Sequence, residues 1–275
     1  MDPVNTVGPR PGTDVGVMHS VVLSRAGVPH GFTERAGGVS RGVFSSLNFG
    51  NPMDLSGEAR DPVPHIEENF RRVLVAIGAA GREVVQVYQV HGAACRVFRA
   101  GGPSREIGPE GTRDFRADVL VTDDPARVVA VRVADCAPVL MASADGRVVA
   151  AVHAGWRGVV AGVVAAAVGA MRTLGGAAAL AAVGPCISRE AFEVGPEVLA
   201  EFRRVFGGAA PVTERPDGKG LVDLRECLRR QLIEAGVAEP EVLPGCTAGE
   251  PARFFSHRRE RGVTGRMVGL IGPRV

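Results

Sequence analysis

Residues 128–158 read VVAVRVADCAPVLMASADGRVVAAVHAGWRG, and this stretch decides the fold class. Together with the segment just before it, the stretch contains four short runs rich in Val, Leu and Ala. Apolar runs of this length, bounded by turn residues, predict buried β-strands. The four predicted strands are residues 119–122, 128–133, 139–142 and 148–152. The Ala- and Val-rich segment 155–174 then predicts a helix that is packed on most of its sides, so we expect a mixed α/β or α+β protein.

The rest of the chain continues this mixture of strands and helices. Further strands are predicted at residues 19–24, 28–32, 84–90 and 179–183. Further helices are predicted at residues 62–80, 196–206 and 223–235, and Asp223 is the expected capping residue of the last one. Loops rich in Gly and polar residues are predicted at 33–50, 100–116 and 207–220.

The composition is that of an ordinary folded protein. The chain has 275 residues, 45% of them hydrophobic, and 32 basic against 30 acidic residues give a net charge of +2. This charge gives no reason to expect nucleic-acid binding. The longest apolar run, 159–171, is too short to cross a bilayer at roughly 1.5 Å per residue, so no membrane span is expected. Residues 1–16 are predicted to form a flexible tail, and residues 17–275 a single domain.

The cysteines and the N-terminus both indicate a cytoplasmic protein. None of the five cysteines forms a CxxC pair, and a domain of this size needs no disulfides, so we expect reduced thiols. Residues 1–16 lack the apolar core of a signal peptide. Since no heptad repeat is evident either, a monomer is the expected state.

Two histidines and one cysteine stand where predicted strands end. His91 precedes Gly92, His153 is followed closely by Gly155, and Cys136 lies just after the strand 128–133. Strand ends beside glycine turns often expose functional side chains. Three protein ligands with an open fourth position are typical of catalytic zinc, whose bound water has a pKa near 7. A plainer interpretation also fits, because a lone His is often a structural residue and a lone Cys a small core residue.

Other polar residues could bind or transform a substrate. Arg35 lies in the Gly-rich loop, Arg157 and Trp156 follow His153, and Arg258 lies in an aromatic and basic segment near the C-terminus. Guanidinium groups near a pocket suit phosphate or carboxylate, although each of these arginines would also be an ordinary surface charge. Asp135, beside Cys136, could orient a ligand, act as a base, or simply cap a turn.

Many short segments together resemble one known protein family. They occur in the family's order from about residue 20 onward, and only their combination is specific. The matching segments are 31–40 (GFTERAGGVS), 46–50 (SLNFG), 89–92 (QVHG), 117–123 (ADVLVTD), 134–136 (ADC), 152–158 (VHAGWRG), 183–187 (VGPCI), 192–195 (FEVG), 223–224 (DL), 246–247 (CT), 254–259 (FFSHRR) and 264–267 (TGRM). The chain therefore resembles the laccase-domain, or multicopper polyphenol oxidase-like, proteins, which are also known as purine nucleoside phosphorylases. Small departures occur at Phe49, at His257 and in the segment 187–191, and the last of these could change substrate preference.

The resemblance implies a fold, a metal site and an activity. The fold is a β-sheet sandwich flanked by helices, and zinc is held by His91, Cys136 and His153. The implied reaction is phosphorolysis of adenosine, inosine and S-methyl-5′-thioadenosine to the free base and a ribose 1-phosphate, with adenosine deamination attributed to the same family. The implied partners are thus a purine nucleoside and phosphate.

The chemistry of these reactions suggests roles for specific residues. Asp135, Cys136 and His153 are the predicted catalytic residues, with Asp135 as the proton shuttle of a deamination. Arg35 and Arg258 are the candidates for the phosphate side. The complete set of predicted substrate-binding residues is Arg35, Asn48, Trp156, Arg157 and Arg258.

Three other functions remain open at this point. A copper-dependent polyphenol oxidase is less consistent with the sequence, because a multicopper centre needs many imidazoles and the chain has six His and no His-x-His. A Cys–His hydrolase or amidase, such as one that edits peptidoglycan precursors, would use Cys136 as nucleophile and His153 as base. A binding module without catalysis is the fourth alternative.

Overall fold

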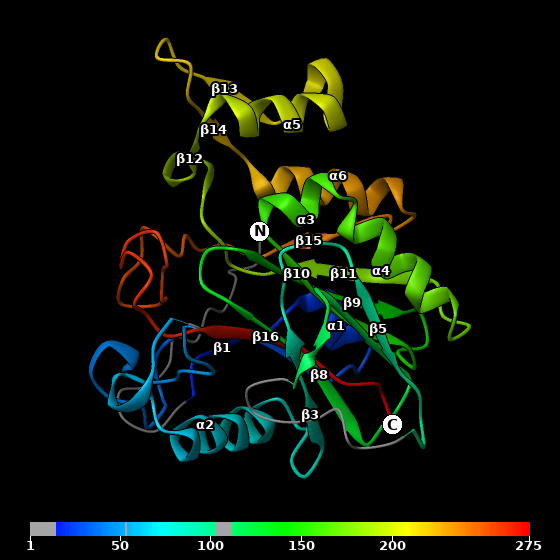
Figure 1. Ribbon diagram of the computed structural model, residues 1–275. Helices are drawn as coiled ribbons and strands as arrows, with labels where there is room; N and C mark the ends of the chain where they lie inside the picture. Colours follow the sequence, from blue (N-terminus) through cyan, green and yellow to red (C-terminus); the bar gives the residue numbers. More distant parts are fainter. Residues whose placement is uncertain (1–14, 53, 103–111) are drawn as a thin grey trace, which may run out of the picture.

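The computed structural model describes residues 15–52, 54–102 and 112–275, and its centre is a pair of packed β-sheets (Figure 1). The five-stranded sheet has the order β1 (Val17–Met18), β2 (His30–Thr33), β16 (Met267–Ile271), β8 (Arg127–Val133) and β3 (Glu83–Val85). The six-stranded sheet has the order β15 (Glu241–Val242), β11 (Ala178–Val183), β9 (Ala137–Ser143), β10 (Val149–Ala154), β7 (Val119–Thr122) and β5 (Cys95–Phe98). Most neighbouring strands are antiparallel, but β3–β8, β5–β7 and β11–β15 are parallel pairs.

The central strands are buried on both faces, which explains their continuous apolar sequences. In β8, Val129 and Val131 point into the core between the two sheets, whereas Val128 and Ala130 point to the opposite face. The strand β10 behaves in the same way, because Val149 faces the core between the sheets. Side chains alternate between the faces of a strand, so each of these strands contributes to two layers of core.

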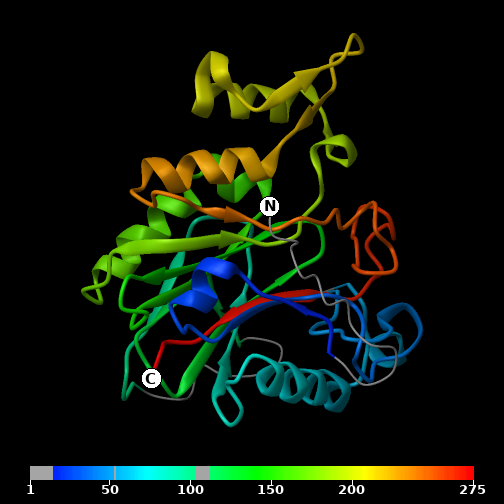
Figure 2. The same cartoon turned by 180° about the vertical axis from the view of Figure 1, so that it is seen from behind.

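Helices cover both outer faces of the sandwich (Figures 1 and 2). The helix α2 (Val63–Ala76) packs Phe70 and Val73 against the five-stranded sheet. The helices α3 (Trp156–Val160), α4 (Val163–Arg172) and α6 (Leu224–Glu234) lie over the six-stranded sheet. This layered arrangement confirms the predicted mixed α+β class with a sandwich flanked by helices. Within the described residues, no helix is both long and apolar enough to span a membrane.

A smaller unit projects beyond the six-stranded sheet (Figure 1, top). It consists of α5 (Pro196–Phe206) and a three-stranded sheet of β12 (Glu193–Val194), β14 (Gly220–Val222) and β13 (Val212–Glu214). The predicted helix 196–206 is confirmed, but the predicted loop 207–220 is wrong in part, because it contains β13 and the start of β14. Short 3-10 helices occupy Gly42–Phe44, Gly57–Ala59, Arg189–Ala191 and Gly207–Ala209.

Other predicted elements are wrong for identifiable reasons. The predicted strand 19–24 is mostly the helix α1 (Val21–Arg25), whose first turn is capped because Leu23 N donates to Ser20 Oγ at 3.2 Å. The predicted helix 155–174 is two helices, since Gly162 has a left-handed φ of 77° between α3 and α4.

The predicted strand 84–90 is also divided. It forms β3 and the separate strand β4 (Val87–Tyr88), which pairs with β6 (Thr112–Arg116) inside the predicted loop 100–116. Residues 103–111 of that loop lie outside the described residues, as do residues 1–14 of the predicted tail. Gly16, at the end of the predicted tail, is hydrogen-bonded through its backbone to Glu34 and Ala36.

Candidate metal centre and its cavity

Three side chains from distant parts of the chain meet at one end of the sandwich. His91 follows β4 with a left-handed φ of 60°, Cys136 lies in the turn from β8 to β9, and His153 lies in β10. One ligand atom from each residue lies within 4.8 Å of the other two. Among the described residues, this is the one group of three or more His, Cys, Asp or Glu side chains arranged in this way.

Asp118, a fully buried residue just before β7, fixes the two histidines. Its Oδ1 accepts hydrogen bonds from the His91 backbone N–H at 2.9 Å and from His153 Nδ1 at 2.8 Å. Its Oδ2 accepts a hydrogen bond from Gly92 N at 2.6 Å. A carboxylate can only accept, so Nδ1 of His153 carries the proton and Nε2 is left as the ligand atom. Asp118 therefore sets both the loop of His91 and the tautomer of His153.

The charges at this site favour a thiolate. Burial alone would raise the pKa of Cys136, but the charge and hydrogen bonds of His153 and His91 outweigh it and lower the pKa to about 6. Burial likewise disfavours the charged form of His153, but the Cys136 thiolate and Asp118 raise its pKa to about 9. Without a metal, Cys136 and His153 thus form a thiolate–imidazolium pair at neutral pH.

The donor set and the space around it fit a metal ion. One thiolate and two imidazoles are ligands that zinc and copper both accept. In a tetrahedral site with bonds of roughly 2.0–2.3 Å, ligand atoms lie about 3.5 Å apart, so small inward movements would complete the site. Gly155 keeps this space open, because a Cβ there would lie 3.0 Å from Cys136 Sγ and 3.3 Å from His91 Cδ2.

Gly155→Ala is therefore expected to weaken metal binding by about tenfold, the equivalent of a modest overpacking cost. The measurement is a competition titration of the purified protein with Zn²⁺ and a chelator. Gly169→Ala is the matched control, because a Cβ at Gly169 in α4 meets nothing within 4 Å. The control should keep its metal affinity and gain about 0.5–1 kcal/mol of stability. Equal metal affinity in both variants would show that the space at Gly155 is not needed.

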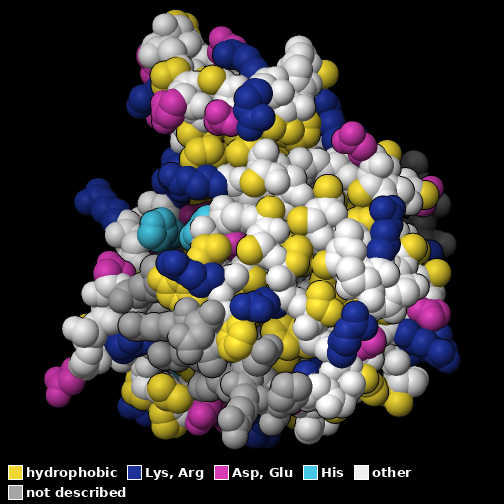
Figure 3. Space-filling model, turned by 45° about the vertical axis from the view of Figure 1, so that its right-hand side comes forward, with side chains coloured by type: hydrophobic (Ala, Val, Ile, Leu, Met, Phe, Trp, Pro, Cys, Tyr) yellow, Lys and Arg dark blue, Asp and Glu magenta, His cyan; other side chains and the backbone are white. Residues whose placement is uncertain are grey.

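The three side chains open into a cavity of about 970 Å³. Its lining is strongly basic, with five arginines against the two carboxylates of Asp54 and Asp135. The arginines are Arg60, Arg116, Arg132, Arg258 and Arg266. Tyr88 and Phe192 add two aromatic rings. Figure 3 shows histidine side chains at the surface below the projecting unit, with Lys and Arg side chains nearby.

Comparison with known proteins identifies the family to which the chain belongs. The sequence profile of a family described as multi-copper polyphenol oxidoreductase laccase matches residues 29–274. The chain belongs to this family. It is 39% identical over 250 residues to a protein of Deinococcus radiodurans named purine nucleoside phosphorylase, covering 90% of each chain. It is 37% identical over 237 residues to the purine nucleoside phosphorylase YfiH of Escherichia coli, covering 86% of this chain and 90% of the relative.

A solved structure of this laccase-like family has the same fold. The crystal structure of YlmD from Geobacillus stearothermophilus matches with a TM-score of 0.81 at 31% identity, covering 94% of this chain and 97% of that chain. The family resemblance predicted from the sequence is thereby confirmed.

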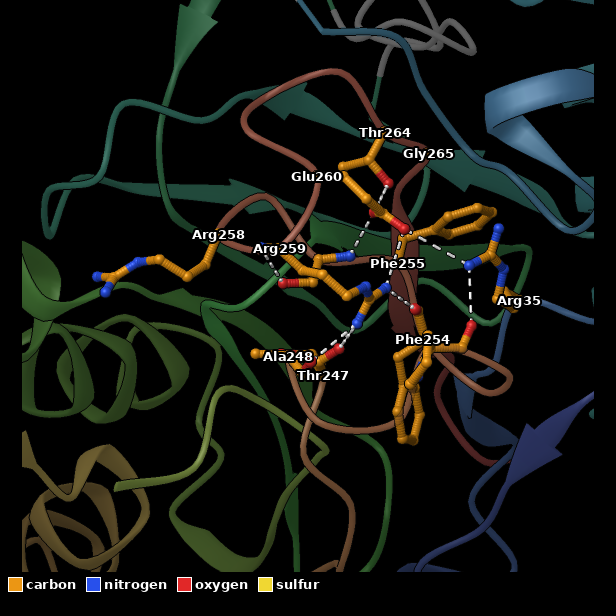
Figure 4. Close-up of polar contacts among 12 residues, drawn as sticks. Arg35, Thr247, Ala248, Phe254, Phe255, Arg258, Arg259, Glu260, Thr264 and Gly265 are labelled. Atoms are coloured by element: carbon orange, nitrogen blue, oxygen red, sulfur yellow. Dashed lines mark hydrogen bonds and ion pairs between the residues drawn. The ribbon is translucent and has the colours of Figure 1, made fainter. Parts of the chain in front are cut away.

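Of the predicted substrate-binding residues of this family member, Arg258 alone lines the cavity. Arg35 is engaged elsewhere: its Nε and Nη2 donate to the Ser45 carbonyl at 3.1 Å, and its Nη1 donates to the Pro251 carbonyl at 2.9 Å. Its guanidinium also lies over the Phe255 ring, 4.5 Å from the centroid. In Figure 4, Arg35 and Arg258 lie on opposite sides of the segment 254–259. The Arg35 side chain thus contacts neighbouring loops outside the cavity lining, and its role on the phosphate side stays a prediction.

Asn48, Trp156 and Arg157 do not line the cavity either. Asn48 is fully buried, and its Oδ1 accepts hydrogen bonds from the backbone of Gly50 and Arg266. Trp156 begins α3 and packs partly against the core, while the Arg157 guanidinium lies 4.6 Å from the centroid of its ring. All three side chains lie outside the cavity lining, and their role in substrate binding stays a prediction.

Asp135 lines the cavity, but its carboxylate is occupied. Oδ1 accepts a hydrogen bond from Thr247 Oγ1 at 2.6 Å, and Oδ2 accepts one from Arg258 N at 2.7 Å. Its carbonyl accepts a hydrogen bond from Ile187 N at 3.0 Å, and its φ of 90° is left-handed. Asp135 thus joins three loops around Cys136, which favours positioning over proton transfer.

Several residues of the site are not predicted from the sequence. Asp118 interrupts an apolar segment, and a buried carboxylate among Val and Leu was the available signal. Tyr88, Arg116 and Arg132 lie on strands beside the cavity, and their sequences carry no comparable signal. Arg266 lies in the family-matching segment 264–267, but no role was assigned to it.

Proposed function

We propose that this protein is a zinc-dependent purine nucleoside phosphorylase that acts on adenosine, inosine and S-methyl-5′-thioadenosine. The observation that carries the proposal is that His91, Cys136 and His153 converge at a basic cavity large enough for a nucleoside. The relatives named purine nucleoside phosphorylase support it over nearly the whole chain. The second substrate is inorganic phosphate, whose charge suits a cavity lined by arginines.

His91, Cys136 and His153 are the proposed zinc ligands. When bound, zinc supplies a Lewis-acidic centre beside the substrate. Zinc is preferred to copper because a multicopper centre needs several sets of imidazoles, whereas the described residues contain one three-ligand group. Asp118 holds His91 and His153 in place for this role.

The protein's own residues contribute mainly by binding and orientation. The arginines offset the charge of phosphate and hold it in a fixed position, which lowers the entropic cost of its attack on the sugar. Asp135 fixes the loops that bear Cys136 and Arg258. Adenosine deamination at the same site is part of the proposal, and it would need a proton shuttle other than Asp135.

A Cys–His hydrolase is the second candidate function, and a specific contact favours it. Asp118, His153 and Cys136 form a carboxylate–imidazole–thiolate series, the arrangement of an activated cysteine nucleophile. Zinc ligation and nucleophilic attack are exclusive uses of one thiolate, so the two functions can be separated. If alkylation of the Cys136 thiol abolishes turnover equally in metal-loaded and metal-free protein, this result would favour the hydrolase.

The test is the metal content of the purified protein, combined with product analysis on adenosine and inosine. We expect about one zinc per chain, as for a mononuclear catalytic site. The free base and ribose 1-phosphate should appear only when phosphate is present. Formation of inosine from adenosine without phosphate would report deamination, and zinc-loaded protein without any of these products would overturn the proposed function.

A further inference from the structure

The cavity has two walls with different chemistry. The first, which we name the aromatic wall, consists of Ile187, Phe192 and Arg258. The Arg258 guanidinium carbon lies 5.7 Å from the centroid of the Phe192 ring. Both Nη1 and Nη2 of Arg258 donate to the Glu193 carbonyl at 3.2 Å. Arg258 therefore contacts both the Phe192 ring and the Glu193 backbone, and these contacts join the base of the projecting unit to the main body.

The second wall, which we name the arginine wall, consists of Tyr88, Arg116, Arg132 and Arg266. The strands β4 and β6 place Arg116 over Tyr88, with 5.6 Å from the guanidinium carbon to the ring centroid. The backbone of Arg132 pairs with the Gln89 side chain through two hydrogen bonds of 2.8 Å. The β4–β6 pairing and the Gln89 hydrogen bonds thus fix the backbone at Arg116 and Arg132, from which the two guanidinium groups extend.

Close packing also directs two of these guanidinium groups. A Cβ at Gly50 would lie 2.9 Å from Arg132 Cδ, so the glycine makes room for the arginine stem. Arg266 donates its backbone N–H to Asn48 Oδ1 at 2.8 Å and Nη1 to the Thr264 carbonyl at 2.7 Å. Arg116, Arg132 and Arg266 bring three positive charges to the cavity lining, which also contains the carboxylates of Asp54 and Asp135.

Chain connectivity and backbone hydrogen bonds link two of the candidate metal ligands to these walls. His91 follows the β4 strand of Tyr88 by three residues. Cys136 follows Asp135, which is hydrogen-bonded to Ile187 N and to Arg258 N of the aromatic wall. All of these residues line one cavity, so a ligand at the His–Cys–His group can contact side chains of both walls.

We propose that the arginine wall is the phosphate subsite and that the aromatic wall is the purine subsite, with the ribose held between them. This assignment rests on the proposed phosphorolysis. Guanidinium groups bind phosphate through paired, charge-assisted hydrogen bonds, and an aromatic ring offers a stacking surface for a purine. Arg258, which the sequence placed on the phosphate side, belongs to the purine side instead.

The assignment gives a balanced reaction. An oxygen of hydrogen phosphate forms a bond to C1′ of the ribose, and the bond from C1′ to the purine nitrogen breaks. The electron pair of that bond leaves with the purine. The proton of hydrogen phosphate ends on the purine nitrogen, so the products are the neutral base and the ribose 1-phosphate dianion. In this assignment the arginine wall holds the attacking phosphate and the aromatic wall holds the leaving purine.

Steady-state kinetics of two variants of the full-length, metal-loaded protein test the assignment. Arg116→Gln should raise the KM for phosphate about tenfold and leave the KM for inosine within about twofold, the loss expected for one charge-assisted contact. Phe192→Leu should do the reverse, raising the KM for inosine about tenfold through lost stacking. Arg172→Gln at the exposed end of α4 and Phe206→Leu at the end of α5 are matched controls away from the cavity.

Calorimetric titration with orthophosphate, without nucleoside, provides a readout that does not need turnover. Wild-type protein should bind phosphate, Arg116→Gln should bind it about tenfold more weakly, and Phe192→Leu should bind it like wild type. Unchanged phosphate affinity in Arg116→Gln, or no phosphate binding by wild type, would overturn the subsite assignment. Phosphate binding that follows this pattern in a protein without phosphorolysis would instead overturn the proposed function and retain the subsite.

Discussion

Cys136→Ala is expected to leave the purified protein nearly free of metal and to lower its phosphorolysis rate by more than about a hundredfold. The removal of a ligand's hydrogen-bond partner alone commonly costs roughly 10- to 100-fold, so the loss of a ligand should exceed this. The fold should survive, because Cys136 lies in a turn and is partly exposed. Metal analysis, inosine phosphorolysis and the thermal midpoint are measured on the same preparation.

Cys95→Ala is the matched control for the loss of a thiol. Cys95 is also partly exposed, it begins β5, and its Sγ lies 3.6 Å from the Ala93 carbonyl, away from the cavity lining. The control should retain its metal and its activity. Full phosphorolysis by Cys136→Ala would refute the assignment of the ligand set, whereas loss of metal with unchanged turnover would separate the reaction from the metal.

The strands that were predicted best are those buried on both faces. The runs at 119–122, 128–133 and 148–152 lie within one or two residues of β7, β8 and β10, because a strand inside a sandwich must be apolar on both sides. The strand β6 escaped prediction, since it contains the charged residues Arg113 and Asp114 and pairs with β4. Because β4 is distant from β6 in sequence, the pairing of the two strands leaves no pattern in the local sequence of either one.

Helix α1 shows how a distant residue can override a local preference. Its sequence Val-Val-Leu favours a strand, yet Ser20 caps a helix there. Glu241, some 220 residues away, accepts hydrogen bonds from Ser20 Oγ at 2.7 Å and from the backbone N–H groups of Val21 and Val22 at 3.1 Å. These contacts satisfy the free N–H groups of the first turn, and the local sequence does not contain them.

The candidate site was only partly visible in the sequence for the same reason. His91, Cys136 and His153 could be selected because each follows or ends a strand pattern and each matches a family segment. The arginines that face the cavity could not be identified from the sequence, because the chain has 32 basic residues and tertiary packing decides which of them reach the cavity. Arg35 was chosen for its Gly-rich loop, yet it binds the carbonyls of Ser45 and Pro251, whereas Arg116 faces the cavity from an unpredicted strand.

Asp118→Asn tests whether the carboxylate that joins both histidines is needed for metal binding. The carboxylate accepts from three donors, His91 N, Gly92 N and His153 Nδ1. An amide has one accepting oxygen, so its NH₂ group must face either Gly92 N or both His91 N and His153 Nδ1. If it faces His153, the imidazole must turn Nδ1 into an acceptor, which places the proton on Nε2 and blocks its use as a ligand.

The expected result for Asp118→Asn is a metal affinity about 10- to 100-fold below wild type and an unfolding free energy lower by about 1–3 kcal/mol. Competition with a chelator measures the first quantity, and urea denaturation of the metal-free protein measures the second. Asp123→Asn is the matched control, since Asp123 follows β7 and accepts a hydrogen bond from Ala100 N at 2.8 Å, which an amide oxygen can also accept. Wild-type metal affinity in Asp118→Asn would mean that the backbone alone orients His91 and His153, whereas a selective loss in this variant would establish Asp118 as the residue that positions both ligands.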